Sequence, residues 1–265
     1  MSDGLSATSP RRAEGVRDRT TLVIYVLLLV VTGGAWAHIL TSMSGGDMAG
    51  MDMVMTPTLI DGVSYVVAWA VMMTAMMLPS ALPMIGLYAG TQRPASIPTR
   101  AVSVALFALT YLALWALTGI PVYLASLALM AVSAGTLAYV VAGVLAMSGA
   151  FQLTPLKHVC LRHCRSPLGF LLGHWREGRT GALAMGWAHA VYCVGCCWAL
   201  MVVLVVAGAM GLPWVLLVAC AVAAEKLLPD GERVARLIGV ALILLGVAVA
   251  IRPALAAALR SSGSM

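Results

Sequence analysis

Charged side chains are scarce in this sequence, since Asp, Glu, Lys and Arg make up 10% of its 265 residues. Ordinary soluble domains carry about a quarter. Hydrophobic residues make up 62%, which excludes a soluble globular domain. The chain also lacks a Ser/His/Asp set, a glycine-rich phosphate loop and paired carboxylates, so no catalytic site is expected. These absences predict a non-enzymatic, multi-pass protein of the cell inner (plasma) membrane, surrounded by lipid bilayer.

Seven apolar runs are long enough, or nearly long enough, to cross a bilayer, which takes about 20 residues. They lie near 21–40, 61–90, 100–125, 132–153, 182–210, 212–228 and 238–259. The predicted fold is therefore all-α, a polytopic helical bundle. Pro79 and Pro83 in the second run and Pro121 in the third should kink or break their helices. The sixth run is short and ends in Glu225 and Lys226, which we expect near a membrane interface.

Basic residues indicate how the chain is oriented, because Lys and Arg collect on the cytoplasmic side. They occur in the N-terminal tail and in the second-to-third, fourth-to-fifth and sixth-to-seventh connections, and the alternate loops have none. This pattern predicts a cytoplasmic tail (1–20), a first transmembrane helix (21–40), a Met-rich extracytoplasmic loop (41–60) and a helical membrane domain (61–260). A basic His/Cys cytoplasmic loop spans 154–181. The net charge of +6 reflects this topology, and nucleic acid is not an expected partner.

Methionines recur in two places. The extracytoplasmic loop contains Met48, Met51, Met53 and Met55, and the second run contains Met72, Met73, Met76 and Met77. A thioether is a soft, uncharged ligand that suits Cu(I). We expect the second group to lie beside an unwound turn at Leu78-Pro79-Ser80, as is common at transport sites. The alternative is that both groups are adaptable filler, against a surface or within a helical core.

A second sulfur cluster lies in the fifth run. The side chains of His189, Cys193, Cys196 and Cys197 follow helical spacings, so most of them share one stripe. Imidazole and thiolates suit Cu(I) or Zn(II), and the Met72 to Met77 segment could supply further ligands. The alternative is that the cysteines are small hydrophobes and the histidine is a core residue.

The cytoplasmic loop holds a third cluster, in which Cys160 and Cys164 are flanked by His158 and His163. Such a turn could offer two to four metal ligands. The surrounding basic residues equally fit an amphipathic helix on anionic headgroups, with Phe170, Leu171 and Trp175 as its apolar face.

Four strings in this order resemble one bacterial family: WAVMMTAMMLPSALP, FQLTPLKHVCLRHCRSP, YCVGCCWALM and AEKLLP. This is domain-of-unknown-function family 2182, catalogued as predicted metal-binding integral membrane proteins. The resemblance covers about residues 69 to 228 and implies a helical membrane fold and a role with metal. The Met-rich loop by itself resembles the methionine motifs of extracytoplasmic copper-binding proteins.

Together these features predict a membrane protein that captures, holds or relays a soft metal ion, Cu(I) before zinc. The outer loop would collect it, and Cys160 and Cys164 would lie at the opposite end of the path. A competing hypothesis is a non-catalytic accessory or scaffold subunit, packed on a larger and perhaps copper-dependent membrane enzyme. A thiol redox carrier using Cys193, Cys196 and Cys197 ranks below both, because a disulfide between vicinal cysteines is strained.

Overall fold

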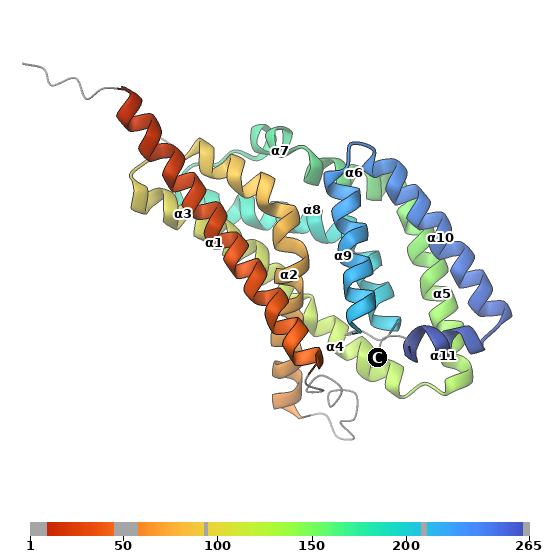
Figure 1. The fold of residues 1–265 in the computed structure, drawn as a ribbon. Helices are drawn as coiled ribbons and strands as arrows, with labels where there is room; N and C mark the ends of the chain where they lie inside the picture. Colours follow the sequence, from red (N-terminus) through yellow and green to blue (C-terminus); the bar gives the residue numbers. More distant parts are fainter. Residues whose placement is uncertain (1–9, 45–57, 93–94, 208–210, 262–265) are drawn as a thin grey trace, which may run out of the picture.

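The computed structural model describes residues 10–44, 58–92, 95–207 and 211–261. Every regular element in these ranges is helical, which confirms the all-α prediction (Figure 1). The helices are α1 (Pro10–Ser44), α2 (Leu59–Thr91), α3 (Ile97–Leu117), α4 (Gly119–Met130), α5 (Ala134–Gln152), α6 (Pro155–Arg165), α7 (Pro167–His174), α8 (Gly178–Val206), α9 (Leu212–Leu227), α10 (Gly231–Ile251) and α11 (Ala254–Ser261).

Six segments of the described chain are long and apolar enough to cross a membrane, one fewer than the seven expected. They are Thr21–Ser42, Leu59–Thr91, Ile97–Met130, Gly135–Gln152, Gly178–Val206 and Gly231–Ile251. The remaining run forms α9, whose 16 residues span about 24 Å at 1.5 Å per residue. Its ends nevertheless reach opposite ends of the bundle, because Trp214 donates to the Leu259 carbonyl (3.0 Å) and Glu225 bonds to α6. We treat α9 as a short crossing.

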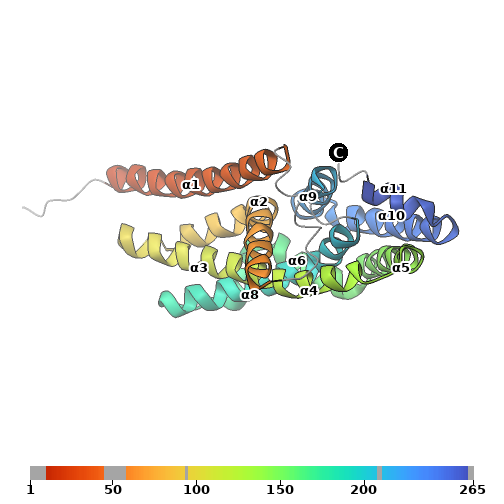
Figure 2. The same cartoon turned by 90° about the horizontal axis from the view of Figure 1, so that it is seen from below.

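The proline-containing helix α2 is kinked, as predicted, but it is not unwound. It changes direction sharply in two perpendicular views (Figure 1, Figure 2), while residues 59–91 remain helical through Pro79 and Pro83. The expected unwound turn was therefore wrong. Near the kink, the carbonyl of Met77 accepts hydrogen bonds from the Ser80 hydroxyl (2.8 Å) and the Tyr111 hydroxyl (3.2 Å), and prolines are a common cause of such bends.

The third predicted span is interrupted just before Pro121. Helix α3 ends at Leu117, α4 begins at Gly119, and Thr118 joins them. Pro121 has no N–H to donate to Leu117, four residues earlier, and its ring clashes with that carbonyl. The break predicted from this proline is confirmed.

The basic connections share one end of the bundle. The first turn of α3 is tied to the N-terminal half of α1 by a hydrogen bond from Arg100 to Thr21 (2.6 Å). Arg165 at the end of α6 donates to the carbonyls of Leu228 and Pro229 in the α9–α10 turn. Figure 1 shows α6, α7 and the starts of α1 and α10 along the same edge. This geometry agrees with the alternating charge pattern, and the cytoplasmic identity of that edge stays a prediction.

Two groups of buried residues form the interior. The larger, here called the sulfur core, joins α2, α3 and α8 and reaches α6, α7 and α9. The smaller, here called the glycine-packed pair, is centred on α5 and α10. There the two backbones approach so closely that a methyl group added at Gly246 would lie 2.8 Å from the Ala142 carbonyl oxygen. The candidate site lies in the sulfur core.

Candidate metal centre

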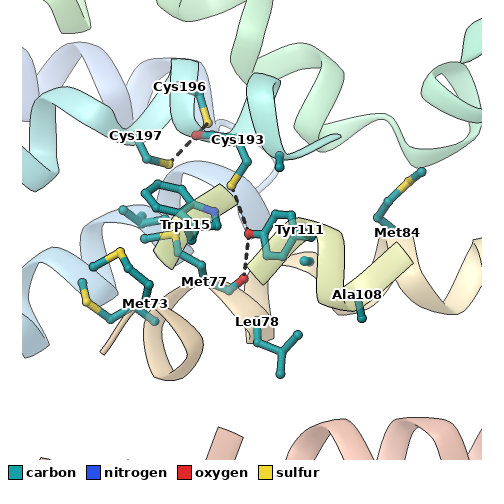
Figure 3. Packing of buried hydrophobic residues seen from close by; sticks show 14 of the residues in the cluster. Met73, Met77, Leu78, Met84, Ala108, Tyr111, Trp115, Cys193, Cys196 and Cys197 are labelled. Carbon is teal, nitrogen blue, oxygen red and sulfur yellow. Dashed lines mark hydrogen bonds between the residues drawn. The ribbon is translucent and has the colours of Figure 1, made fainter. Parts of the chain in front are cut away.

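Four cysteines from two helices meet in the sulfur core. On α8 the side chains of Cys193, Cys196 and Cys197 are almost completely buried, at most 1% exposed. The Cys196 sulfur lies 3.3 Å from that of Cys197 and 3.8 Å from that of Cys164 on α6. Two thiolates bound to one metal at about 2.3 Å in a tetrahedral arrangement are about 3.8 Å apart. The Cys164–Cys196 pair therefore has the spacing of two ligands of one metal, and Figure 3 shows the three thiols of α8 side by side.

The thiols are adjacent in pairs and do not surround a common point. Across the described ranges, no group of three or more His, Cys, Asp or Glu side chains is arranged to hold a metal ion. A pair of thiolates is enough for two-coordinate Cu(I). Its near-linear arrangement needs the two sulfurs farther apart than they are here, so binding requires side-chain rotation, as a three- or four-coordinate ion would. All six cysteines are free thiols, so none is held in a disulfide.

A buried lysine faces the thiols. The Lys226 ammonium on α9 donates to the Cys193 sulfur (2.9 Å) and to the Ser80 hydroxyl at the kink of α2 (3.1 Å). Its side chain is buried inside the protein, and the expected position near a membrane interface stays a prediction. Helix α6 packs over this end of α9 and removes it from the surface. In the described part of the chain, Lys226 forms no ion pair with a carboxylate.

A second buried lysine is neutralised by a carboxylate. Lys157 on α6 forms an ion pair with Glu225 (2.6 Å), and both side chains are fully buried. Gln152 also donates to Glu225 (2.8 Å), and Lys157 donates to the carbonyl of Cys196. Burial acts to lower the pKa of Lys157, but the neighbouring Cys197 and Glu225 outweigh it and raise that pKa above its usual value. The ammonium of Lys157 is therefore charged at neutral pH.

Tyr111 of α3 connects the thiols to the kinked helix. Its hydroxyl lies 3.1 Å from the Cys193 sulfur and donates to the Met77 carbonyl (Figure 3). The predicted methionines Met72, Met73, Met76 and Met77 are all buried, at most 4% exposed, in the same core as the thiols. Because α3 packs on both α2 and α8, Tyr111 and Trp115 stand between the methionine segment and the cysteines.

His189 lies on the predicted stripe but faces aromatic rings. Its imidazole centre lies 5.5 Å from the Tyr111 ring, 6.0 Å from Phe107 and 5.4 Å from Phe170. Its Nδ1 atom is buried and has no hydrogen-bond partner among the described residues. A buried polar atom without a partner costs about 1–3 kcal/mol. His189 therefore stands one helical turn from Cys193 with unused donor or acceptor capacity.

The His/Cys cluster of residues 158–164 is divided by the fold. Cys164 joins the thiols of α8, whereas Cys160 is half-buried against Gly195, where an added methyl group would lie 3.0 Å from the Cys160 sulfur. Burial raises the pKa of Cys160, so this thiol is protonated at neutral pH. His163 stacks on Tyr192 with ring centres 4.2 Å apart. The structure therefore places the two cysteines against different residues of α8.

The proposed apolar face of an interfacial helix is also revised. Phe170 and Leu171 of α7 are buried in the sulfur core, and only Trp175 of the three is exposed. These two side chains pack inward because α7 folds back onto α2 and α8. The Met-rich loop residues Met48, Met51, Met53 and Met55 lie outside the described residues.

Sequence reasoning missed the polar partners of Cys193, namely Lys226 and Tyr111, and the polar groups behind them, namely Ser80, Lys157 and Gln152. One signal was available, because Glu225 and Lys226 interrupt an apolar run, and ionisable residues within membrane segments are often functional. Their position at the end of that run made a surface location the simpler interpretation.

Comparison with known proteins assigns this arrangement to a family. Neither a curated protein nor a solved structure matches the chain. The family model PpoB2, described as a copper chaperone, matches residues 66–249. The matched region contains the methionine segment, the thiols and both buried lysines. This match confirms the metal-related family that the four sequence strings implied, and it does not test the family number 2182. The chain therefore belongs to the PpoB2 family of copper chaperones.

Proposed function

We propose that this protein holds Cu(I) as cargo at the thiols of Cys164, Cys193, Cys196 and Cys197 and passes it to a copper-dependent partner at the membrane. The observation that carries the proposal is the buried thiol cluster, with sulfur atoms 3.3 and 3.8 Å apart, facing the Lys226 ammonium. Thiolates are soft ligands that favour Cu(I). Holding and transferring an ion between such ligands requires no catalytic group, so the protein acts as a carrier.

Charge balance supports a monovalent ion. Lys157 is neutralised by Glu225, which leaves the positive charge of Lys226 beside the thiols. Two thiolates carry two negative charges, and one Cu(I) together with the Lys226 ammonium carries two positive charges. The loaded site is then neutral, which avoids the large cost of an uncompensated buried charge. Zn(II) would need a third thiolate for the same balance, and the fourth cysteine makes zinc the alternative metal to test.

The hydrogen bonds to Cys193 favour the same chemistry. A thiol must lose its proton to bind a metal, and both Lys226 and Tyr111 lie within hydrogen-bond distance of the sulfur. A metal-bound thiolate keeps lone pairs that can accept these hydrogen bonds. Such donors around a metal ligand fix its orientation and stabilise its negative charge.

The fold changes the predicted order of copper-binding positions along the path. Cys164 belongs to the thiol cluster, so the cytoplasmic end of the path and the thiol site are one place. We assign the thioethers of Met72, Met73, Met76 and Met77 to a neighbouring weaker position, from which Cu(I) reaches the thiols past Tyr111. The Met-rich loop is assigned to capture of Cu(I) on the opposite side, by the softness of its ligands.

The test is anaerobic purification of the full chain followed by elemental analysis. The wild-type protein should carry close to one copper per chain, and a Cys193→Ser/Cys196→Ser variant should carry almost none. Cys220→Ser is the matched control, because Cys220 is an exposed cysteine on α9 away from the cluster. If the elemental analysis finds zinc and no copper, the assignment of Cu(I) is contradicted and zinc is the bound metal. A metal-free protein that copurifies with a fixed membrane partner would favour the accessory-subunit function instead.

A further inference from the structure

A cavity opens at the basic end of the bundle, beside the metal centre but outside it. It has a volume of about 490 Å³ and lies between the α6–α7 corner and the start of α10. Its lining residues are Arg162, Arg165, Ser166, Pro229, Asp230, Glu232, Arg233 and Arg236. Four arginines against two carboxylates leave a net charge of +2, so the cavity suits an anion.

The two acidic side chains neutralise only part of the positive charge of the four arginines. Glu232 lies 3.6 Å from Arg162, and Asp230 lies 3.2 Å from Arg233. Arg162, Asp230 and Arg233 are largely exposed and Glu232 is partly exposed, and exposed ion pairs of this kind contribute little. Arg165 donates to the carbonyls of Leu228 and Pro229, so a phosphate can compete chiefly for the guanidinium groups of Arg162, Arg233 and Arg236, whose planar donors match its oxygens.

An apolar stripe continues from these arginines along α10. Residues Leu237, Val240, Leu244, Val247 and Ile251 are exposed, from 47% to 73%. Their spacing of three and four residues puts them on the same helix face as Arg233 and Arg236. The opposite face of α10, which includes Gly239 and Gly246, packs on α5. One face of α10 thus presents cationic groups at its start and hydrocarbon along the rest of its length.

We propose that this cavity binds the phosphate headgroup of an anionic phospholipid, whose acyl chains lie along the exposed stripe of α10. Basic pockets between transmembrane helices are suited to such headgroups. An acidic protein segment would match the charge of the arginines but would leave the adjoining apolar stripe of α10 uncovered. The bound lipid would join the α6–α7 corner to the α9–α10 turn, the segments next to Cys164 and Lys226.

The experiment uses the full chain in nanodiscs of phosphatidylcholine, with and without phosphatidylglycerol. Thermal unfolding and native mass spectrometry report stabilisation and retained lipid. Phosphatidylglycerol should raise the unfolding temperature and remain bound. Arg233→Gln/Arg236→Gln should weaken its binding about 25-fold, since each arginine near an anionic surface contributes about a factor of five. Arg176→Gln/Arg179→Gln is the charge-matched control, because both residues are exposed near the same end but lie outside the cavity.

A separate arm adds inorganic phosphate to the protein in phosphatidylcholine alone. Little stabilisation by phosphate, together with strong stabilisation by phosphatidylglycerol, supports the lipid site. Equal stabilisation by free phosphate would overturn it in favour of a small-anion pocket. The lipid assignment is also overturned if both double variants lose binding equally, or if phosphatidylglycerol has no effect. Copper content does not enter these readouts, so the proposal is independent of the metal centre.

Discussion

The sulfur core and the glycine-packed pair are two ways of holding membrane helices together. In the sulfur core, buried methionines, cysteines and aromatic rings surround two lysines and one carboxylate. In the glycine-packed pair the buried residues are Ala138, Val141, Ala142, Leu145, Val203, Val206, Val249 and Ala256. These are all small or aliphatic, and the helices there meet through close approach of their backbones.

The contrast separates what assembles the bundle from what gives it chemistry. Small residues let membrane helices pack closely without polar groups, which is sufficient for α5 and α10. Buried ionisable groups cost stability in a membrane protein and usually mark a functional site. A scaffold alone would not require Lys157, Lys226 and Glu225 in its interior. The division predicts that changes in one region alter metal binding, and changes in the other alter only stability.

The largest stability effect should follow Glu225→Gln, which leaves the buried Lys157 ammonium without a counter-charge. Breaking a buried ion pair from one side costs about 3–5 kcal/mol, measured as the free energy of unfolding in detergent. The double variant Lys157→Met/Glu225→Leu should recover much of the loss, because no lone charge remains. A single variant as stable as wild type would contradict the buried pair and weaken the distinction between the two regions.

The next largest effect is expected in the glycine-packed pair, where Gly246→Ala forces a methyl group against the Ala142 carbonyl. Overpacking of this kind costs about 1–3 kcal/mol of unfolding free energy. Copper content should not change, because the thiols lie in the other region. Gly143→Ala is the control, since nothing lies within 4 Å of a methyl group added there. Loss of copper in a folded Gly246→Ala protein would show that the regions are coupled.

The same division explains what the sequence could predict. The apolar runs predicted the long helices, Pro79 predicted the kink in α2, and Pro121 predicted the break before α4. These features depend on local chain chemistry. Helical spacing was enough to group Cys193, Cys196 and Cys197. The inward fold of α6, which brings Cys164 and Lys157 to them, depends on long-range packing. The position of Tyr111 between α2 and α8 also depends on long-range packing, which residue spacing along the sequence cannot predict.

Tyr111→Phe tests the connection between the thiols and the kinked helix. The variant loses the hydroxyl contacts with Cys193 and the Met77 carbonyl, at about 1 kcal/mol each or about 2 kcal/mol together. Copper should still bind, with an affinity reduced about tenfold, because a donor to a ligand sulfur is missing. A competition titration against a Cu(I) chelator measures this shift. An unchanged affinity would mean that Tyr111 serves packing alone.

The smallest effect on stability should come from Met73→Leu/Met77→Leu, because volume-conserving core swaps usually cost less than about 1.5 kcal/mol. If the thioethers are a position that Cu(I) passes through, copper per chain stays the same while loading from a Cu(I) donor slows several-fold. Met147→Leu is the control, since this methionine on α5 is 68% exposed and should leave loading unchanged. Equal loading rates in both variants would make the buried methionines filler, and the chemistry of the sulfur core would then rest with its thiols and Lys226.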